Sequence, residues 1–225
     1  MVINMEIKGI DISHWQGYVD FNAVKASGIE FVIIKAGGSD KGFYTDRCFE
    51  DNYTRAKAAG LKVGAYYFVG KMFYKAEAGV ADAERFSSIL KGKQFEFPVF
   101  LDLETTDPRF KTEATDAAIA FCETMENHGY FVGIYASDIS GFKEKLELER
   151  IKQYCHWCAR YGSAPKYCTD WVIWQQSSKG NVPGISGYVD VDLAETDLSK
   201  VITEKGFNGF PKKPKKKKEV TKDGI

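Results

Sequence analysis

A repeated alternation of apolar and helix-forming segments constrains the fold of this chain more than any other feature. The predicted strands cover 6–13, 30–38, 62–70, 97–104 and 130–137, and the predicted helices between them cover 20–28, 46–60, 75–90 and 112–129. Near-continuous apolar strands that alternate with helices are typical of a parallel sheet covered by helices. After residue 150 this rhythm gives way to three short predicted strands, in the segments HWCARYG, DWVIWQQSS and GYVDVDLAE.

A parallel sheet of this kind can stay open or close into a barrel, and either form binds ligands at the carboxyl ends of its strands. An open nucleotide-binding sheet should carry a glycine-rich loop after its first strand. The first strand here ends in DISHWQG, and AGGSDKG after the second strand lacks the spacing of a phosphate loop. We therefore expect an α/β fold that closes into a barrel.

Acidic residues gather where the predicted strands end. In FPVFLDLETTD, Asp102 and Glu104 stand two apart, and residues i and i+2 of a strand share a face with Cα atoms about 6.5 Å apart. Asp11 lies near the end of the first strand, and Asp190 and Asp192 lie in the last one. Because the first and last strands of a closed barrel are neighbours, these acids should ring one mouth.

Such a ring suits the cleavage of a glycosidic bond. Like charges packed together raise at least one pKa, so a protonated acid can stand beside an ionised one. One group then donates a proton to the leaving oxygen while another stabilises positive charge at the sugar carbon. A single acid at a strand end more often caps a helix or pairs with lysine, so the hypothesis depends on the whole set.

Two other classes of function remain open. Clustered carboxylates also suit a divalent cation, which would make the protein a metal-dependent hydrolase, although His14 is the only histidine near the acids. A barrel that binds sugar without cleaving it is the other alternative. The presence of both Asp102 and Glu104 argues against it, because binding alone needs no protonated carboxyl group.

The five cysteines are predicted to be free thiols, because their number is odd and no leader is visible. Cys155 and Cys158 match C-x-x-C, with His156 and Cys168 nearby, which raises the alternative of zinc or redox chemistry. The segment is predicted to be extended, and residues three apart in a strand face opposite sides. We therefore expect half-buried thiols and no metal.

Length and charge predict one catalytic domain and a tail. The chain has 225 residues, enough for one sizeable core, which we place at 1–210. Residues 211–225, which begin PKKPKKKK, hold seven lysines and two prolines and cannot bury apolar surface. We therefore predict a disordered tail or linker, with attraction to an anionic surface as the alternative. The remainder is mildly acidic, which does not suit a nucleic-acid enzyme.

The acid-bearing segments resemble the lysozymes of glycoside hydrolase family 25, the Chalaropsis-type N-acetylmuramidases. The matching segments, in the order of the family, are GIDISHWQG, FVIIKAG, GLKVGAYYF, FPVFLDLE, GYFVGIYAS, WVIWQQSS and VPGISGYVDVDLAE. They cover about residues 5–200. The resemblance implies an irregular TIM-like barrel of five β/α units followed by about three short strands. It also implies cleavage, without a cofactor, of the β-1,4 bond between N-acetylmuramic acid and N-acetylglucosamine in peptidoglycan.

The resemblance also implies roles for individual residues. Glu104 is the expected general acid/base, and Asp102 is the second catalytic carboxylate, which supports an intermediate formed with the acetamido group of the sugar. Asp11 and Asp190 complete the acidic floor, with Asp192 behind them. The residues expected to contact or border the sugar are Tyr66, Tyr135, Trp174, Trp15 and His14. Trp157 is expected in the core.

Relatives of this kind include phage endolysins and bacterial autolysins, and the endolysins fit best a chain with free cysteines and no visible leader. We expect a protein made in the cytoplasm that acts on the cell wall, released by a pore protein if it is an endolysin and secreted if a leader was removed. No run of residues is long enough to span a bilayer. The tail could join a wall-binding module, and we expect a monomer.

Overall fold

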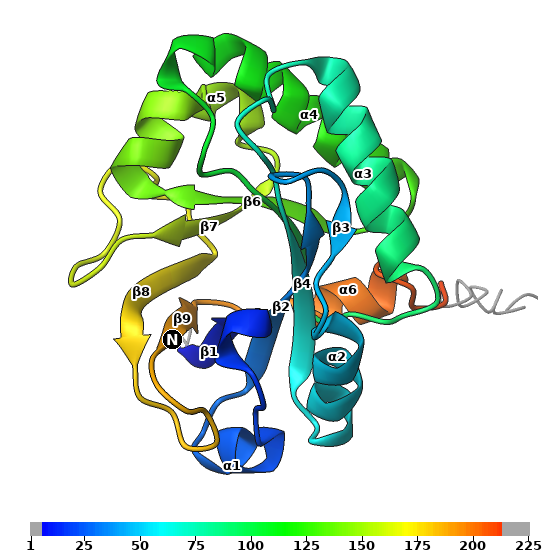
Figure 1. Ribbon diagram of the computed structural model, residues 1–225, viewed down its shortest axis with the longest axis vertical. Coiled ribbons are helices and arrows are strands. Elements are labelled where there is room, and N and C mark those ends of the chain that lie inside the picture. The colour runs from blue at the N-terminus through cyan, green and yellow to red at the C-terminus, as the bar shows by residue number, and fades with distance from the viewer. Residues whose placement is uncertain (1–5, 213–225) are drawn as a thin grey trace, which may run out of the picture.

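Eight strands close into a barrel in the computed structural model, which describes residues 6–212 (Figure 1). The strand order around the barrel is β1-β9-β8-β7-β6-β5-β4-β2, and β1 pairs with β2 to close it. The strands are β1 (Ile7–Ile12), β2 (Phe31–Gly38), β4 (Lys62–Phe68), β5 (Val99–Asp102), β6 (Val132–Ser137), β7 (Cys155–Ala159), β8 (Ile173–Gly180) and β9 (Val189–Ala194).

The direction of the strands makes the barrel irregular. Neighbours from β1 through β8 are parallel, whereas β9 runs antiparallel to both β8 and β1. The two-residue strand β3 (Tyr44–Thr45) extends the sheet beside β2. The prediction of an irregular TIM-like barrel, with five β/α units followed by three further strands, is confirmed.

Four predicted helices form close to their expected bounds and lie outside the barrel (Figure 1). They are α1 (Phe21–Ala26), α2 (Phe49–Ala58), α3 (Ala76–Leu90) and α4 (Lys111–Asn127). Five further helical segments in residues 6–212 were not expected from the sequence. They are the 3-10 turns η1 (His14–Gln16) and η2 (Pro108–Phe110), the π-helical turn η3 (Asp138–Lys143), α5 (Leu148–Ile151) and α6 (Ser199–Lys205). None of the helices in 6–212 is long and apolar enough to cross a membrane.

The strands separate two packed regions. Between the barrel and its helices lies the larger core, with Val63, Leu101 and Phe121 among its fully buried members. A smaller cluster fills the barrel interior, where Phe31, Phe100 and Trp157 meet. Gly9 makes room for this cluster, because a Cβ atom there would lie 2.1 Å from the ring of Phe31. The interior is thus filled with side chains below the level of the acids, so it is a core and no channel.

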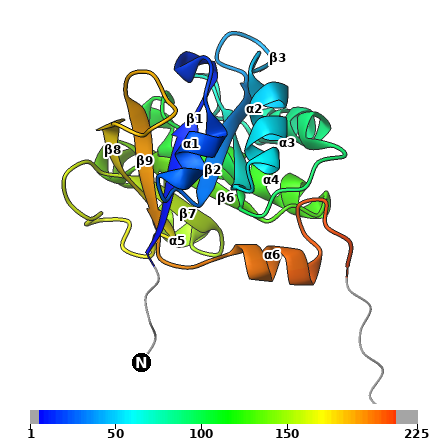
Figure 2. The ribbon, with the colours of Figure 1, turned by 90° about the horizontal axis from the view of Figure 1, so that it is seen from below.

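The segment from α6 onward closes the end of the barrel where the parallel strands begin. Figure 2 shows α6 at one end of the molecule and β3 at the other. Asn208, fully buried, donates to the carbonyls of Phe95 and Phe97 and accepts from the amide of Phe131. Residues up to 210 are therefore packed as part of the barrel domain. Of the predicted tail at 211–225, residues 213–225 lie outside the described part of the chain.

Candidate active site

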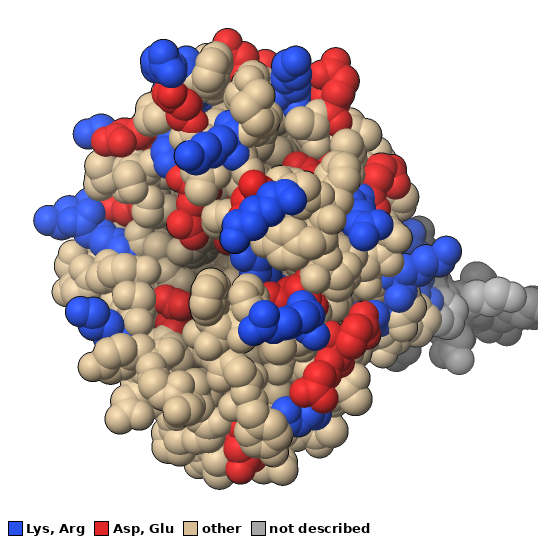
Figure 3. Space-filling model, viewed as in Figure 1, with Lys and Arg blue, Asp and Glu red and all other residues tan. Residues whose placement is uncertain are grey.

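The predicted acids meet at the carboxyl ends of the parallel strands. Asp102 is the last residue of β5, and Glu104 stands two residues further on in the loop, so the predicted strand 97–104 ends earlier than expected. The alternation of β5 still holds for Glu104, because Phe100 fills the interior while Leu101 and Leu103 pack outward. Asp11 pairs with Asp190 across β1 and β9. Figure 3 shows a hollow near the middle of this face with acidic side chains beside it.

The Asp102–Glu104 pair combines one buried and one accessible carboxyl group. Asp102 is 4% exposed, whereas Glu104 lies at the surface of the mouth. The two carboxyl groups lie close enough for each to influence the pKa of the other. Burial raises the pKa of Asp102 well above its usual value, and the charge of Glu104 raises it further. The pair therefore retains a proton to higher pH than two isolated carboxyl groups would.

Removal from water also raises the pKa of Glu104 above its usual value. The positive charges of Lys145 and Lys35 oppose this shift. Lys145 also donates a hydrogen bond to the backbone carbonyl of Glu104, and Lys35 lies with its Nζ 4.5 Å from the ring centre of Phe68. The two lysines thus limit the rise in the pKa of Glu104.

The floor of the site is a second group of acids. Burial, followed by the charges of Asp192 and Asp190, raises the pKa of Asp11 well above its usual value. The pKa of Asp190 is raised to about 6, with burial as the main cause. Asp192 is buried and accepts a hydrogen bond of 2.8 Å from the indole of Trp157, while its Oδ2 has no hydrogen-bond partner within the described chain. Three carboxyl groups therefore share a space where they cannot all be ionised at little cost.

Gln175 connects this floor to the aromatic wall, and the sequence interpretation missed it. Its Nε2 donates to Asp11 at 2.6 Å, and its Oε1 accepts from the hydroxyl of Tyr135 at 2.9 Å. The hydroxyl of Tyr161 donates to the same Oε1 at 3.2 Å. The alternation of β8 could have identified Gln175, because Ile173 faces the barrel interior and residue i+2 shares its face.

The aromatic residues named from the sequence do not all reach the site. Tyr66 and Tyr135 pack against Trp157 inside the barrel, with ring centres 6.0 and 4.4 Å away. Trp15 is 81% exposed and lies at the rim of the cleft. Trp174 alternates with Ile173 and Gln175 and so lies on the outer face of β8, where its indole donates to the carbonyl of Arg160 at 2.7 Å. The structure does not bring Trp174 to the acids.

Asp102 and Glu104 open into a cleft of about 330 Å³. Its lining includes Trp15, Lys35, Tyr66, Phe68, Asp102 and Glu104. His14 borders the same cleft, and its Nδ1 lies 2.7 Å from Oδ2 of the buried Asp46. A hollow of about 690 Å³ lies beside it, with Asp40 and Phe68 common to both. The site is an open groove with an acidic floor and aromatic sides, a shape that fits an extended polar chain such as a glycan.

The C-x-x-C segment is extended, as predicted, and Cys155 is half-buried, whereas Cys158 is fully buried. All five cysteines are free, and Cys155 and Cys158 pack on opposite sides of β7. Cys158 belongs to the outer core, whereas Cys155 lies against the barrel interior. The C-x-x-C pair therefore cannot hold one metal ion between its two thiols in this conformation.

A barrel with a carboxyl pair at the ends of its strands has the arrangement that glycoside hydrolysis requires. A family model described as "Glycosyl hydrolases family 25" matches residues 10–185. The chain belongs to this family.

Similar proteins include two lysozymes and an endolysin. The chain is 36% identical over 187 residues to the "Autolytic lysozyme" of Clostridium acetobutylicum, which covers 83% of this chain and 55% of that protein. It is similar to the solved structure of the CTP1L endolysin, with 31% identity and a TM-score of 0.75. The match covers 87% of this chain and 69% of the endolysin chain. The solved structure of the bacterial lysozyme from Streptomyces coelicolor is 27% identical, with a TM-score of 0.72, and the match covers 88% of this chain and 95% of that one. The chain spans about half the length of the curated autolytic lysozyme.

Proposed function

We propose that this chain is a lysozyme, a 1,4-β-N-acetylmuramidase that cleaves peptidoglycan between N-acetylmuramic acid and N-acetylglucosamine. The Asp102–Glu104 carboxyl pair, which lines one cleft at the mouth of the barrel, carries this proposal. Membership of glycosyl hydrolases family 25 supports it, and so does the similarity to an autolytic lysozyme. The groove beside the pair has the acidic floor and the exposed aromatic rim that a glycan needs.

Glu104 is the proposed general acid. It is the accessible member of the pair, so its proton can reach the glycosidic oxygen, and its raised pKa lets it hold that proton to higher pH than a solvated glutamate would. The leaving sugar takes this proton as the bond to the anomeric carbon breaks. The Glu104 carboxylate then removes a proton from the attacking water, which restores the acid for the next cycle.

Asp102 is the proposed partner of the substrate. It lies below Glu104, and its Oδ1 has no hydrogen-bond partner in the part of the chain that the structure describes. An acetamido group on the sugar offers an N–H donor that would satisfy this buried oxygen and hold the group against the anomeric carbon. Asp11 and Asp190 stabilise the positive charge that develops there, and Gln175 holds Asp11 in place.

The aromatic side chains are proposed to shape the groove. Trp15 at the rim offers an exposed face to a sugar ring, and Tyr66 lines the cleft beside Asp102. Tyr135 acts through Gln175, because the Tyr135 hydroxyl donates a hydrogen bond to Oε1 of Gln175. Trp174 receives no role in sugar contact here, because its ring lies on the outer face of β8.

The experiment that tests this function is mass spectrometry of the fragments released from purified peptidoglycan. Wild-type protein is expected to release fragments with N-acetylmuramic acid at the reducing end, and Glu104→Gln is expected to lose turnover by a factor of about 10² or more, because the proton donor is gone. Asp102→Asn should be similarly severe. Glu123→Gln, on the exposed side of α4, makes the same chemical change away from the groove and should keep wild-type activity.

Other outcomes would point to other functions. Fragments with N-acetylglucosamine at the reducing end would make the protein a glucosaminidase on the same barrel. Binding without cleavage of any wall would favour a sugar-binding module. Activity that a chelator abolishes in wild type would favour the metal-dependent hydrolase.

We also propose that the catalytic barrel acts at the cell wall as a monomer, beside a wall-binding module. The greater length of the autolytic lysozyme and of the CTP1L endolysin supports the idea of an additional module in such proteins. Similarity to an endolysin supports release by a pore protein. The longer reading frame at the gene and sedimentation of the barrel alone with purified walls test these proposals.

A further inference from the structure

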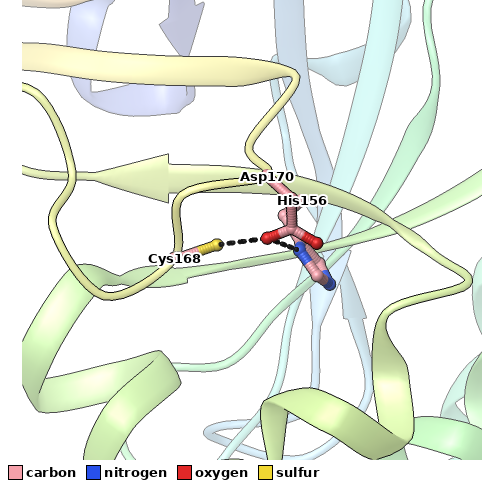
Figure 4. A group of neighbouring side chains, drawn as sticks. All are labelled: His156, Cys168 and Asp170. Atoms are coloured by element: carbon pink, nitrogen blue, oxygen red, sulfur yellow. Dashed lines mark hydrogen bonds and ion pairs between the residues drawn. The ribbon is translucent and has the colours of Figure 1, made fainter.

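A group of metal-ligating side chains lies on the outer side of β7, away from the acidic groove. His156 comes from the strand, and Cys168 and Asp170 come from the loop between β7 and β8 (Figure 4). Nδ1 of His156 lies 3.3 Å from Oδ1 of Asp170, and the Sγ atom of Cys168 lies 3.8 Å from the same oxygen. All three ligand atoms lie within 4.8 Å of one another.

The 3.3 and 3.8 Å separations from Asp170 are close to those expected around one tetrahedral ion. Zinc bonds of about 2.0–2.3 Å to nitrogen, oxygen and sulfur place neighbouring ligand atoms about 3.3–3.7 Å apart. The set of one imidazole, one thiol and one carboxylate is of the mixed kind that zinc accepts. The fourth position is open to water or to the thiol of Cys158, which lies on the same face of β7 as His156.

The other nitrogen of His156 fixes which tautomer faces this group. Nε2 lies 3.2 Å from the carbonyl oxygen of Ile151, which can only accept, so Nε2 carries the proton. In the neutral ring Nδ1 then presents a lone pair toward the carboxylate of Asp170. Two acceptors face each other there, a repulsion that a bound cation or an extra proton must relieve. A backbone carbonyl behind the imidazole is also the arrangement that orients ligating histidines.

The loop that brings Cys168 is held in place independently of any ion. Asp138 accepts the backbone N–H groups of Lys166, Tyr167 and Cys168 at 2.9–3.0 Å. His156 and Cys168 are fully buried, whereas the side chain of Asp170 is 53% exposed. The ligands are therefore preformed, and Asp170 lies where an ion would enter from solvent.

We propose that His156, Cys168 and Asp170 bind one zinc-like transition-metal ion that ties the β7–β8 loop to β7. Binding replaces the thiol proton of Cys168, which leaves to solvent, and requires neutral imidazole and ionised carboxylate. The loop also carries Tyr161, whose hydroxyl donates to Gln175 on the floor of the groove. The site is structural and lies outside the proposed catalytic machinery, so this proposal revises the expectation of no metal without depending on the muramidase activity.

The test is the metal content of full-length, tag-free protein equilibrated with zinc and then desalted. We expect one zinc per chain in wild type, and loss of bound zinc in Cys168→Ser and in Asp170→Asn. Asp170→Asn keeps its size at a half-exposed position and should fold even if the buried cysteine variant does not. Cys155→Ser is the matched control, because it removes a thiol from the same strand on the opposite face and should retain the zinc.

Two further readouts separate a real site from adventitious binding. Cobalt in place of zinc should give a thiolate-to-metal charge-transfer band in wild type and Cys155→Ser, and none in Cys168→Ser. Zinc should raise the melting temperature of wild type and leave that of Asp170→Asn unchanged. Wild type without stoichiometric zinc would overturn the proposal in favour of a protonated His156 paired with Asp170. Equal zinc retention in Cys168→Ser, or a Cys158–Cys168 disulfide in the purified protein, would overturn it as well.

Discussion

At the scale of single residues, the site depends on carboxyl groups held out of water. Asp11, Asp102 and Asp192 are each buried, and burial is the main cause of the raised pKa of every one of them. Ionising all of these carboxyl groups at neutral pH destabilises the folded state, because they are buried and carry like charges. The residues that tune this cluster are therefore the ones whose substitution should shift its pH dependence.

Lys145→Met is expected to move the alkaline limb of the activity profile to higher pH. The positive charge of Lys145 lowers the pKa of Glu104, so its removal lets Glu104 keep its proton to higher pH. The measurement is kcat/KM on soluble wall fragments across pH. Lys143→Met removes the same charge from an exposed neighbour and should leave the limb in place. A limb that shifts downward would contradict the role of Glu104 as acid.

Asp192→Asn is expected to stabilise the fold at pH 7 by about 1–2 kcal/mol. The folded-state pKa of Asp192 is raised, so the folded state holds a proton that the unfolded chain has already lost, and stability falls as pH rises through this interval. An amide at 192 can still accept from Trp157 and carries no charge. The gain in melting temperature should therefore be large at pH 7 and small near pH 4.

The surface variant Glu123→Gln makes the same carboxyl-to-amide change in solvent, and its melting temperature should follow wild type at both pH values. Destabilisation of Asp192→Asn at pH 7 would show that its charge is stabilising in the folded site.

At the scale of elements, the strands and the four main helices follow from the sequence, and the segments between them do not. Apolar periodicity identified β1, β2, β4, β5 and β6 because each is buried on both faces. The π-helical turn η3 is short and has no periodic pattern of its own. It begins at Asp138, directly after the end of β6. The direction of Trp174 was missed because the spacing of a motif does not by itself reveal which face of a strand points inward.

Asp138→Ala is expected to destabilise the fold by about 2–4 kcal/mol. Asp138 is buried, and it accepts three backbone N–H groups and the guanidinium of Arg160, at 2.8 Å, so its loss leaves four donors without an acceptor. Although burial raises its pKa, these hydrogen bonds lower it overall. Its contribution is therefore present above the ordinary aspartate pKa and is lost as pH falls through the lowered one.

Denaturant melts of wild type and Asp138→Ala at pH 7 and near pH 3 check this expectation. The difference in the free energy of unfolding between wild type and Asp138→Ala should be smaller near pH 3 than at pH 7. Asp138→Asn retains one carbonyl acceptor and should fall between them. A loss below 1 kcal/mol at pH 7 would mean that the β7–β8 loop is held elsewhere.

At the scale of the whole molecule, closure of the barrel joins distant parts of the chain. β1 pairs with both β2 and β9, and residues after α6 seal the opposite end through Asn208. Asn208 is the only non-glycine residue in 6–212 with a positive φ, at 52°. The sequence placed the domain boundary near 210 from the lysine-rich composition that follows, but contained no pattern that would assign Asn208 this function.

Asn208→Gly is expected to lower stability by about 2–4 kcal/mol, because two carbonyls and one amide lose their buried partner. Asn208→Ala should be worse still, since alanine is strained at a positive φ where glycine is not. Thermal melts of the two variants check the order. A chain that ends after Lys212 should melt like the full chain, in line with the proposed domain boundary, and a lower melting temperature would contradict it.

The sequence by itself determined the class of fold, the family resemblance and the set of acids, because strand periodicity and strand-end carboxylates are local patterns. Only the tertiary structure decided which side chains meet. It placed Glu104 beyond the end of β5, brought Gln175 to Asp11, turned Trp174 outward and assembled His156, Cys168 and Asp170. These contacts join residues from separate strands and loops. Their geometry follows from barrel closure and strand register, which no local pattern of residues encodes.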